Sequence, residues 1–229
     1  MPRIAEEARA ARRDQIIAAA AECFARSGYH VTTMAGIAAA AGVSKGTPYL
    51  YFAGKEALFI ALYEEWDCGL AARVDAAVGG LAGPARASPR CVLAAVASAV
   101  AGHVTASPQA CRVLMEATTL AAYEPAIAAK VQAANAVILD RLTGLFAAGD
   151  VAGEWPAGTD PALRARLFTA GLYGLMAQWH TGAGSFSLET AMTALAAQAS
   201  VGGQETVSES FPPGSYLAGP VPRRPGSNA

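Results

Sequence analysis

Apolar and polar residues follow helical spacing along most of the chain. Between Arg9 and Arg26, apolar residues recur three and four positions apart while charged residues occupy the other positions, as in a helix that buries one face. Gly, Pro, Ser and Thr lie where these periodic stretches begin or end, and such residues cap or terminate helices. The pattern predicts helices over residues 9–26, 34–41, 45–52, 54–78, 89–105, 108–122, 125–149, 160–181 and 187–200.

The predicted fold is all-α and has two domains. The sequence contains no stretch with the two-residue alternation of a half-buried strand. Residues 1–54 would form a small three-helix domain, and a long helix from about Lys55 would connect it to a larger helical domain over residues 55–201. Residues 202–229 contain five prolines with several Gly and Ser, a composition that predicts a disordered tail.

The second and third predicted helices have the features of a helix-turn-helix. Thr32 or Thr33 can cap the second helix, and Gly42 can end it. Ser44 can cap the third helix, which runs to Phe52 and would be about 12 Å long at 1.5 Å per residue. Two short helices joined by a tight turn with Gly are typical of this motif, whose second helix lies in the major groove of DNA.

Residue types at fixed spacing extend this motif from about Arg13 to Phe59. The matching segments are Gly28-Tyr29-His30-Val31-Thr32-Thr33-Met34, Ile37-Ala38, Ala41-Gly42-Val43-Ser44-Lys45-Gly46-Thr47, Tyr49-Leu50-Tyr51-Phe52 and Lys55-Glu56-Ala57-Leu58. This combination resembles the TetR family of helix-turn-helix repressors. The C-terminal two-thirds of the chain resembles that family in helical layout and length alone.

The resemblance implies which residues lie at the DNA surface, with Tyr49 and Lys55 near phosphates. Hydroxyl groups, ammonium groups and N-terminal backbone amides suit phosphate oxygens, while Thr47 and Leu50 suit thymine methyls and base edges. The DNA-binding residues expected on this basis are Thr33, Ser44, Lys45, Gly46, Thr47, Tyr49, Leu50 and Lys55.

Two residues depart from the usual pattern of the family. Gly36 stands where an acidic residue is common, so the second helix lacks a helix-dipole interaction of about 0.3–1 kcal/mol and carries a glycine cost of about 1 kcal/mol. Pro48 lies inside the third helix and removes one amide donor. A weak or tilted motif leaves an alternative function open, a helical adapter that binds partner proteins without reading DNA.

The helix over residues 160–181 has two apolar faces, one with large residues such as Phe168 and one with small residues. Such a helix can pack inside its own subunit and also against a partner. The family resemblance implies a homodimer whose interface comes from the last two helices of each subunit, with recognition helices about 34–36 Å apart on a roughly palindromic operator. The expected interface residues are Leu167, Gly171, Gly174, Leu188, Met192 and Leu195.

A cavity between the C-terminal helices is expected to bind a small apolar effector, because ligand pockets are mostly apolar with a few polar groups. Residues of both kinds recur there at helical spacing, and several of them suit a plain core equally well. The candidates are His103, Met115, Glu116, Thr119, Tyr123, Phe168, Tyr173 and Met176. His103 and His180 have no acidic or Cys partner at metal-ligand spacing, so neither a metal nor a cofactor is expected.

Composition narrows the class of protein further. Apolar residues make up 53% of the chain and charged residues 15%, with a net charge of −1, which excludes nucleic-acid binding by net charge alone. Residues 1–60 nonetheless carry seven Lys or Arg against five acids. The sequence shows no apolar stretch suited to a signal sequence or membrane span, which predicts a cytoplasmic protein. The four cysteines lie far apart inside helical patterns and are expected to be small buried hydrophobic residues, with a redox or thiol-sensing role as the alternative. They are Cys23, Cys68, Cys91 and Cys111.

The sequence also lacks a Gly-rich phosphate loop, a nucleophile elbow and a paired-His metal motif, which argues against an enzyme. It predicts instead a ligand-responsive transcriptional regulator, a homodimeric repressor that a small apolar effector releases from double-stranded operator DNA. The partner-binding adapter is the alternative.

Overall fold

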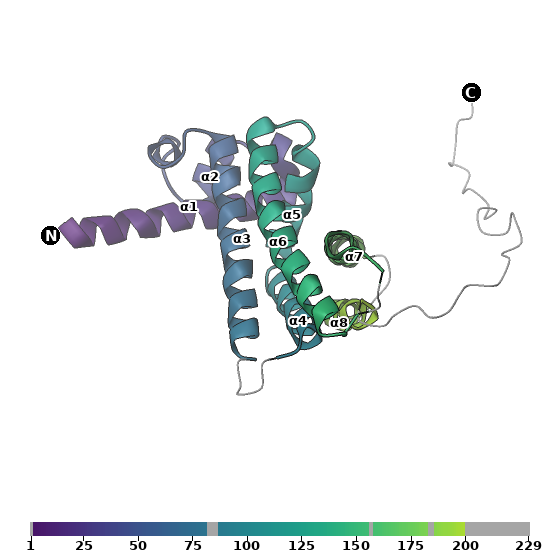
Figure 1. Ribbon diagram of the computed structural model, residues 1–229. Coiled ribbons are helices and arrows are strands. Elements are labelled where there is room, and N and C mark those ends of the chain that lie inside the picture. Colours follow the sequence, from purple (N-terminus) through teal and green to yellow (C-terminus); the bar gives the residue numbers. More distant parts are fainter. Residues whose placement is uncertain (1, 82–86, 156–157, 183–185, 200–229) are drawn as a thin grey trace, which may run out of the picture.

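The computed structural model describes residues 2–81, 87–155, 158–182 and 186–199, and within these ranges it contains helices and no strand (Figure 1). The tail predicted over residues 202–229 lies outside the described residues. The elements are α1 (Pro2–Val31), α2 (Met34–Ala40), the 3-10 helix η1 (Thr47–Leu50), α3 (Lys55–Gly79), α4 (Pro89–Ala106), α5 (Pro108–Leu120), α6 (Pro125–Val151), α7 (Pro161–Thr181) and α8 (Leu188–Gln198).

The helix boundaries follow local capping chemistry. Side-chain oxygens of Thr33, Asp160 and Ser187 accept backbone N–H groups in the first turns of α2, α7 and α8. Proline occupies the first turn of α4, α5, α6 and α7, where an N–H would lack a helical partner in any case. Because these signals are local, the helices predicted from residue 54 onward agree with the observed ones to within a few residues.

The first helix is longer than predicted and bends near its C-terminal end. It starts at Pro2 rather than near Arg9, and it continues past Gly28 to Val31. Gly28 has φ 76° and ψ 166°, a conformation that residues with a Cβ rarely adopt. The helix end expected at Gly28 is therefore a kink between two helical segments.

One hydrophobic core joins the N-terminal helices to α3. Phe24 of α1 and Phe59 of α3 meet edge to face with ring centroids 5.2 Å apart, and the Tyr29 ring lies 5.1 Å from that of Phe59. Ile37 of α2 is fully buried in the same cluster. Since α3 begins in this core and then runs along the C-terminal helices (Figure 1), the domain boundary between residues 54 and 55 stays a prediction.

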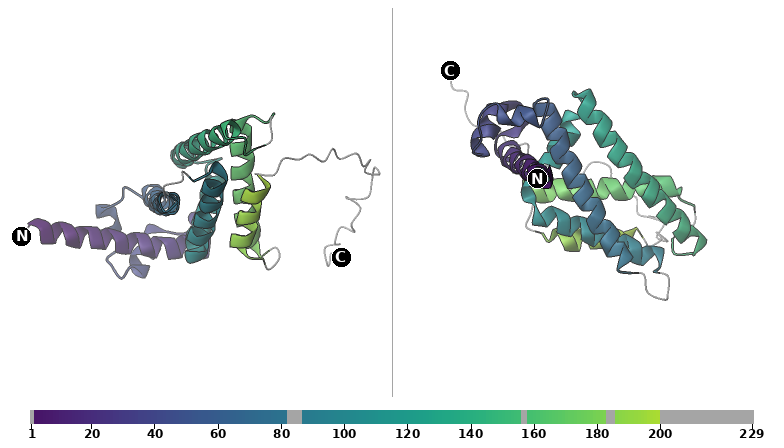
Figure 2. Two further views of the ribbon diagram at one scale, coloured as in Figure 1. Left: turned by 60° about the horizontal axis from the view of Figure 1, so that its bottom comes forward. Right: turned by 90° about the vertical axis from the view of Figure 1, so that its left-hand side faces the viewer.

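The C-terminal helices pack in layers. The helices α3 and α6 run side by side in the same direction, and α7 and α8 cross them (Figures 1 and 2). Between α3 and α8, α4 buries Leu93, Ala97 and Val104. By length and composition α4 is also apolar enough to span a membrane, contrary to the expectation from the sequence, and a third of this helix is buried inside the bundle.

Candidate functional site

The segment predicted as the third helix contains a short 3-10 helix instead of an α-helix. Thr47 N donates to Ser44 O at 2.9 Å, Tyr49 N to Gly46 O at 3.2 Å and Tyr51 N to Pro48 O at 3.1 Å, the three-residue spacing of a 3-10 helix. Pro48 has no N–H with which to form the α-helical bond to Ser44 O. The expectation of an α-helix over residues 45–52 is wrong for this reason.

The tip formed by η1 and the turn before it points outward. Tyr49 is 56% exposed and Leu50 is 73% exposed, while Lys45 and Gly46 are also exposed. The hydroxyl oxygens of Ser44 and Thr47 lie 2.8 Å apart. Beneath this tip the Pro48 ring is buried, so the proline anchors η1 to the core while its neighbours face solvent.

Thr33 and Lys55 have internal partners as well as surface positions. Thr33 is exposed, and its hydroxyl oxygen accepts from Gly36 N at 3.1 Å, which leaves the hydroxyl hydrogen for another acceptor. The ammonium of Lys55 donates to Tyr29 O at 2.7 Å and to His30 O at 3.2 Å, and it lies 4.5 Å from the centre of the Tyr29 ring. Lys55 therefore holds the kinked end of α1 against the start of α3, a role that the sequence analysis missed.

Arginines of α1 supply positive charge beside this tip. The guanidinium of Arg9 lies 5.9 Å from the centre of the Tyr51 ring, and that of Arg13 lies 5.5 Å from the Phe52 ring. Arg13 also pairs with Glu65 at 2.9 Å, whereas Arg12 is exposed beside it. The excess of basic residues near the N-terminus was the signal for this contribution.

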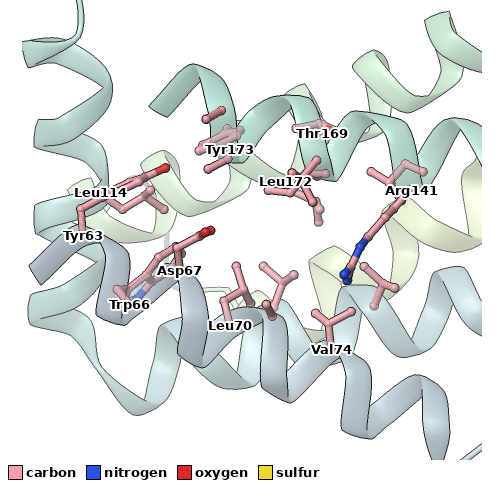
Figure 3. Close-up of a pocket in the computed structure, with 18 of the residues that line it drawn as sticks. Tyr63, Trp66, Asp67, Leu70, Val74, Leu114, Arg141, Thr169, Leu172 and Tyr173 are labelled. Atoms are coloured by element: carbon pink, nitrogen blue, oxygen red, sulfur yellow. The ribbon is translucent and has the colours of Figure 1, made fainter. Parts of the chain in front are cut away.

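A second candidate site is a partly open cavity of about 420 Å³ lined by residues of α3, α4, α5, α6 and α7 (Figure 3). This volume lies within the range of about 300–1,000 Å³ that is typical of small-molecule sites. Most of its wall is apolar. The main apolar side chains are Trp66, Leu70 and Val74 of α3, Val96 and Val100 of α4, Leu114 of α5, Val137, Ile138 and Leu142 of α6, and Leu172 and Met176 of α7.

Two of the predicted ligand residues, Tyr173 and Met176, line this cavity. The other six do not line it: each packs in the core, forms a hydrogen bond with another part of the chain, or is exposed to solvent. Phe168 and Met115 pack in the core, His103 Nε2 lies 3.2 Å from Trp66 O, Glu116 accepts from Tyr29 N, the Thr119 hydroxyl donates to Met115 O at 3.3 Å, and Tyr123 is 79% exposed.

The sequence pattern does not predict the cavity-lining residues of α3 and α6. It predicts α3 as a connecting helix, although residues from Tyr63 to Val74 of this helix form one wall of the cavity. On α6, residues from Lys130 to Leu142 form the facing wall. Apolar residues at helical spacing do mark both helices, but this spacing does not reveal which apolar faces leave a space between them.

Polar groups lie at one end of the cavity and at its edge. Burial raises the pKa of the Tyr63 hydroxyl, the Asp67 carboxyl and the Tyr173 hydroxyl above their ordinary values. At the edge, Lys130 of α6 pairs with Glu64 of α3 at 2.5 Å.

A second ion pair bridges the same two helices, from Arg141 to Asp75 at 3.1 Å. Because α3 and α6 are parallel, the two ion pairs lie three turns apart, or roughly 16 Å at 1.5 Å per residue.

The helix α5 contacts both the cavity and the N-terminal domain. Leu114 lines the cavity. Two residues away on either side, Arg112 donates to Ala25 O at 3.1 Å and Glu116 accepts from Tyr29 N. The α5 helix is thus a direct physical link between the two candidate sites.

The structure divides the predicted dimer residues into two groups. Leu188 and Met192 of α8 are buried in the core of their own chain, and a Cβ on Gly171 would lie 2.7 Å from Leu195 Cδ2. These contacts pack α7 against α8 within the subunit, while Gly171 and Leu195 remain partly exposed, and the assignment of the six residues to a dimer interface stays a prediction. By contrast, Leu167 is 61% exposed and Gly174 has open space beside it.

The cysteines and metal-ligating residues add no third site in the described residues. All four cysteines are free thiols; Cys23 and Cys111 are buried as expected, whereas Cys68 and Cys91 are exposed, so the expectation of burial is wrong for these two. Burial raises the pKa of the Cys111 thiol to about 11, which keeps it protonated and unreactive. The described part of the chain holds no cluster of three His, Cys, Asp or Glu side chains suited to a metal ion.

Sequence comparison with known proteins gives matches to the N-terminal part of the chain. Residues 16–62 match the family described as bacterial regulatory proteins, tetR family. The chain is 43% identical over 65 residues to an HTH-type transcriptional repressor of Mycobacterium tuberculosis, and 51% identical over 51 residues to the fatty acid metabolism regulator protein of Bacillus subtilis. These matches cover 28% and 22% of this chain and 35% and 26% of the relatives, so the chain matches about a third or less of their length.

Solved structures extend the likeness to the whole fold. The fatty acid degradation regulator FadR of Bacillus halodurans superposes with a TM-score of 0.71 at 23% identity, over 84% of this chain and 96% of that one. FadR of Bacillus subtilis, solved in complex with stearoyl-CoA, gives a TM-score of 0.71 at 24% identity, over 81% and 96% of the two chains. At these identities the likeness shows a shared all-helical architecture.

Proposed function

We propose that this chain is a ligand-responsive transcriptional repressor of the TetR family rather than an enzyme, a proposal supported by the match of residues 16–62 to the tetR family of bacterial regulatory proteins. The observation that carries the proposal is the outward-pointing tip around η1. Exposed Lys45, Tyr49 and Leu50 lie around the buried Pro48, with the arginines of α1 beside them. Such a tip offers cations and hydroxyls to phosphates and an apolar side chain to base edges.

We propose that the repressor acts as a homodimer in the cytoplasm and reads a roughly palindromic operator. The outer face of α7 is the proposed contact, because Leu163, Leu167 and Gly174 lie along it at helical spacing with two exposed leucines. On α8, Leu195 is partly exposed beside α7, whereas Leu188 and Met192 are buried within their own subunit. Two-fold symmetry would then set the recognition elements about 34–36 Å apart, one turn of DNA.

The cavity is the proposed effector site, and α5 is the proposed link to the DNA-binding tip. An effector that contacts Leu114 would move α5, and Arg112 and Glu116 would transmit that movement to the kinked end of α1. A shift of the DNA-binding population from 1:99 to 99:1 requires about 5.5 kcal/mol of differential affinity. The ligand therefore has to bind more tightly to the state that does not bind DNA.

The mostly apolar wall favours an effector with an apolar body. Stearoyl-CoA, the ligand in the Bacillus subtilis FadR structure, has such a body and is a suitable first probe. Its acyl chain would occupy the apolar cavity, and its phosphates would lie at the edge near Lys130 and Arg141. Both cations are already paired with acids of α3, so binding of phosphates there would compete with those ion pairs.

Retention of genomic DNA fragments by the purified protein tests this function. The double variant Lys45→Ala with Tyr49→Ala should lose retention, while Lys130→Ala, which removes an exposed ammonium from α6, should retain the same fragments. Retained fragments should then be released by a ligand that binds the cavity, with stearoyl-CoA tried first. If no fragment is retained even at low salt, the partner-binding adapter becomes the better explanation.

A further inference from the structure

The carboxylate of Asp67 lies at one end of the cavity, near the hydroxyl groups of Tyr63 and Tyr173. Figure 3 shows Asp67 and Tyr63 pointing into the same space, while Arg141 lies toward the other end. Apolar side chains of α3, α6 and α7 form most of the remaining wall. An ionisable group therefore faces a largely apolar space that is large enough for a ligand.

Asp67 differs from the acids at the edge of the cavity. Glu64 is paired with Lys130 and Asp75 with Arg141, whereas among the described residues neither an ion pair nor a hydrogen bond reaches the carboxylate of Asp67. Burial raises the pKa of this carboxyl, as expected for a group that loses water and gains no donor. A donor supplied by a ligand would offset that loss.

The hydroxyl groups near Asp67 can also accept hydrogen bonds from a ligand. The Tyr173 hydroxyl donates its hydrogen to Asn135 Oδ1 at 3.1 Å, so its lone pairs are what it can offer to a ligand. The Tyr63 hydroxyl can accept or donate. A ligand N–H placed at this end would meet several acceptors, and a charged ammonium would also neutralise the half-buried carboxylate.

We propose that the end of the cavity at Asp67 favours ligands in which an apolar body carries a protonated amine over alcohols and carboxylates of equal length, and that Asp67 is the residue that binds the amine. This inference rests on the proposed function, because it concerns the same effector cavity. A fatty-acid carboxylate in this position would face Asp67 with like charge. A neutral alcohol would gain a hydrogen bond without the attraction between opposite charges.

Three ligands of one chain length test the inference at pH 7: octylamine, 1-octanol and octanoate. Binding to the full chain can be followed by tryptophan fluorescence, since Trp66 lines the cavity, and by titration calorimetry. Octylamine should bind about tenfold or more tightly than octanoate, which is the factor that one charge-assisted hydrogen bond supplies. The affinity of 1-octanol should lie between the two.

Variants identify the residue responsible. Asp67→Asn keeps the size of the side chain and removes its charge, so the preference for octylamine should disappear. Asp140→Asn removes an exposed carboxylate from α6 and should leave the preference unchanged. Asp67→Glu keeps the charge and should keep the preference, which provides a second test if the asparagine variant does not fold.

The inference is overturned if octanoate binds as tightly as octylamine, if none of the three ligands binds, or if Asp67→Asn retains the preference. All of these measurements use protein without DNA. A failure here is therefore distinguishable from a failure of the proposed function, which the retention of DNA fragments measures separately.

Discussion

The last turn of α6 contains a glycine, Gly149, whose lack of a Cβ leaves room for the side chain of Trp155. Gly149 is buried against the indole of Trp155, and a Cβ on Gly149 would lie 1.6 Å from Trp155 Nε1. The Trp155 ring in turn lies 5.4 Å from that of Phe146 in the core. The sequence marks Gly149 as part of a helix end, but the indole that requires it is visible in the structure alone.

Replacing Gly149 by alanine should therefore destabilise the protein. The added methyl group would force Trp155 out of its site, with a cost in unfolding free energy of about 1–3 kcal/mol or more for overpacking. On the same helix, Gly144 has nothing within 4 Å of a Cβ position, so Gly144→Ala should stabilise the protein by about 0.5–1 kcal/mol. Urea unfolding of the two variants measures both effects, and equal changes in both would contradict this account of the packing.

At the scale of elements, the backbone of Tyr29 ties three helices together. Its carbonyl oxygen accepts from Lys55 of α3, and its N–H donates to Glu116 of α5. From the sequence, Lys55 is expected at DNA and Glu116 at a ligand, because those residue types suit such partners. The observed partners lie 26 and 87 positions away, and neither is foreshadowed by a local pattern.

Removal of the Glu116 carboxylate should weaken this junction. Glu116→Ala leaves the Tyr29 N–H without its acceptor, and the expected loss of unfolding free energy is about 1–3 kcal/mol. Glu116→Gln retains an acceptor oxygen and should lose less. DNA retention in the presence of an effector gives the second measurement: Glu116→Ala should respond less to effector than the unaltered protein, and an unchanged response would exclude α5 as the link.

The helices were more predictable than the surfaces they form. Caps and first-turn prolines located α4 to α8, and Gly28 located the kink of α1. The tip around η1 was found by its residue types, although Pro48 makes it a 3-10 helix rather than an α-helix. The cavity was largely missed, because its wall depends on the spacing of α3 and α6, which run parallel and are bridged by ion pairs at 64–130 and 75–141.

At the scale of the whole molecule, the exposed face of α7 should hold two copies together. Leu167→Asp places a charge in the proposed apolar contact, where its desolvation without a partner is costly, so the protein should become monomeric at concentrations at which the unaltered chain is dimeric. Val151→Asp changes a residue that is 92% exposed at the end of α6 and should leave the dimer intact. Sedimentation analysis distinguishes the two, and a dimer that survives Leu167→Asp would exclude this face.

Binding of one retained DNA fragment as a function of salt concentration tests the central claim most directly. If the tip around η1 and the α1 arginines neutralise phosphates, the logarithm of the binding constant should fall linearly with the logarithm of the salt concentration. The slope should be roughly −0.9 for each phosphate contacted. Lys45→Ala should reduce that slope by about one contact per subunit. A slope near zero, or a slope that Lys45→Ala leaves unchanged, would contradict the assignment of this tip to DNA.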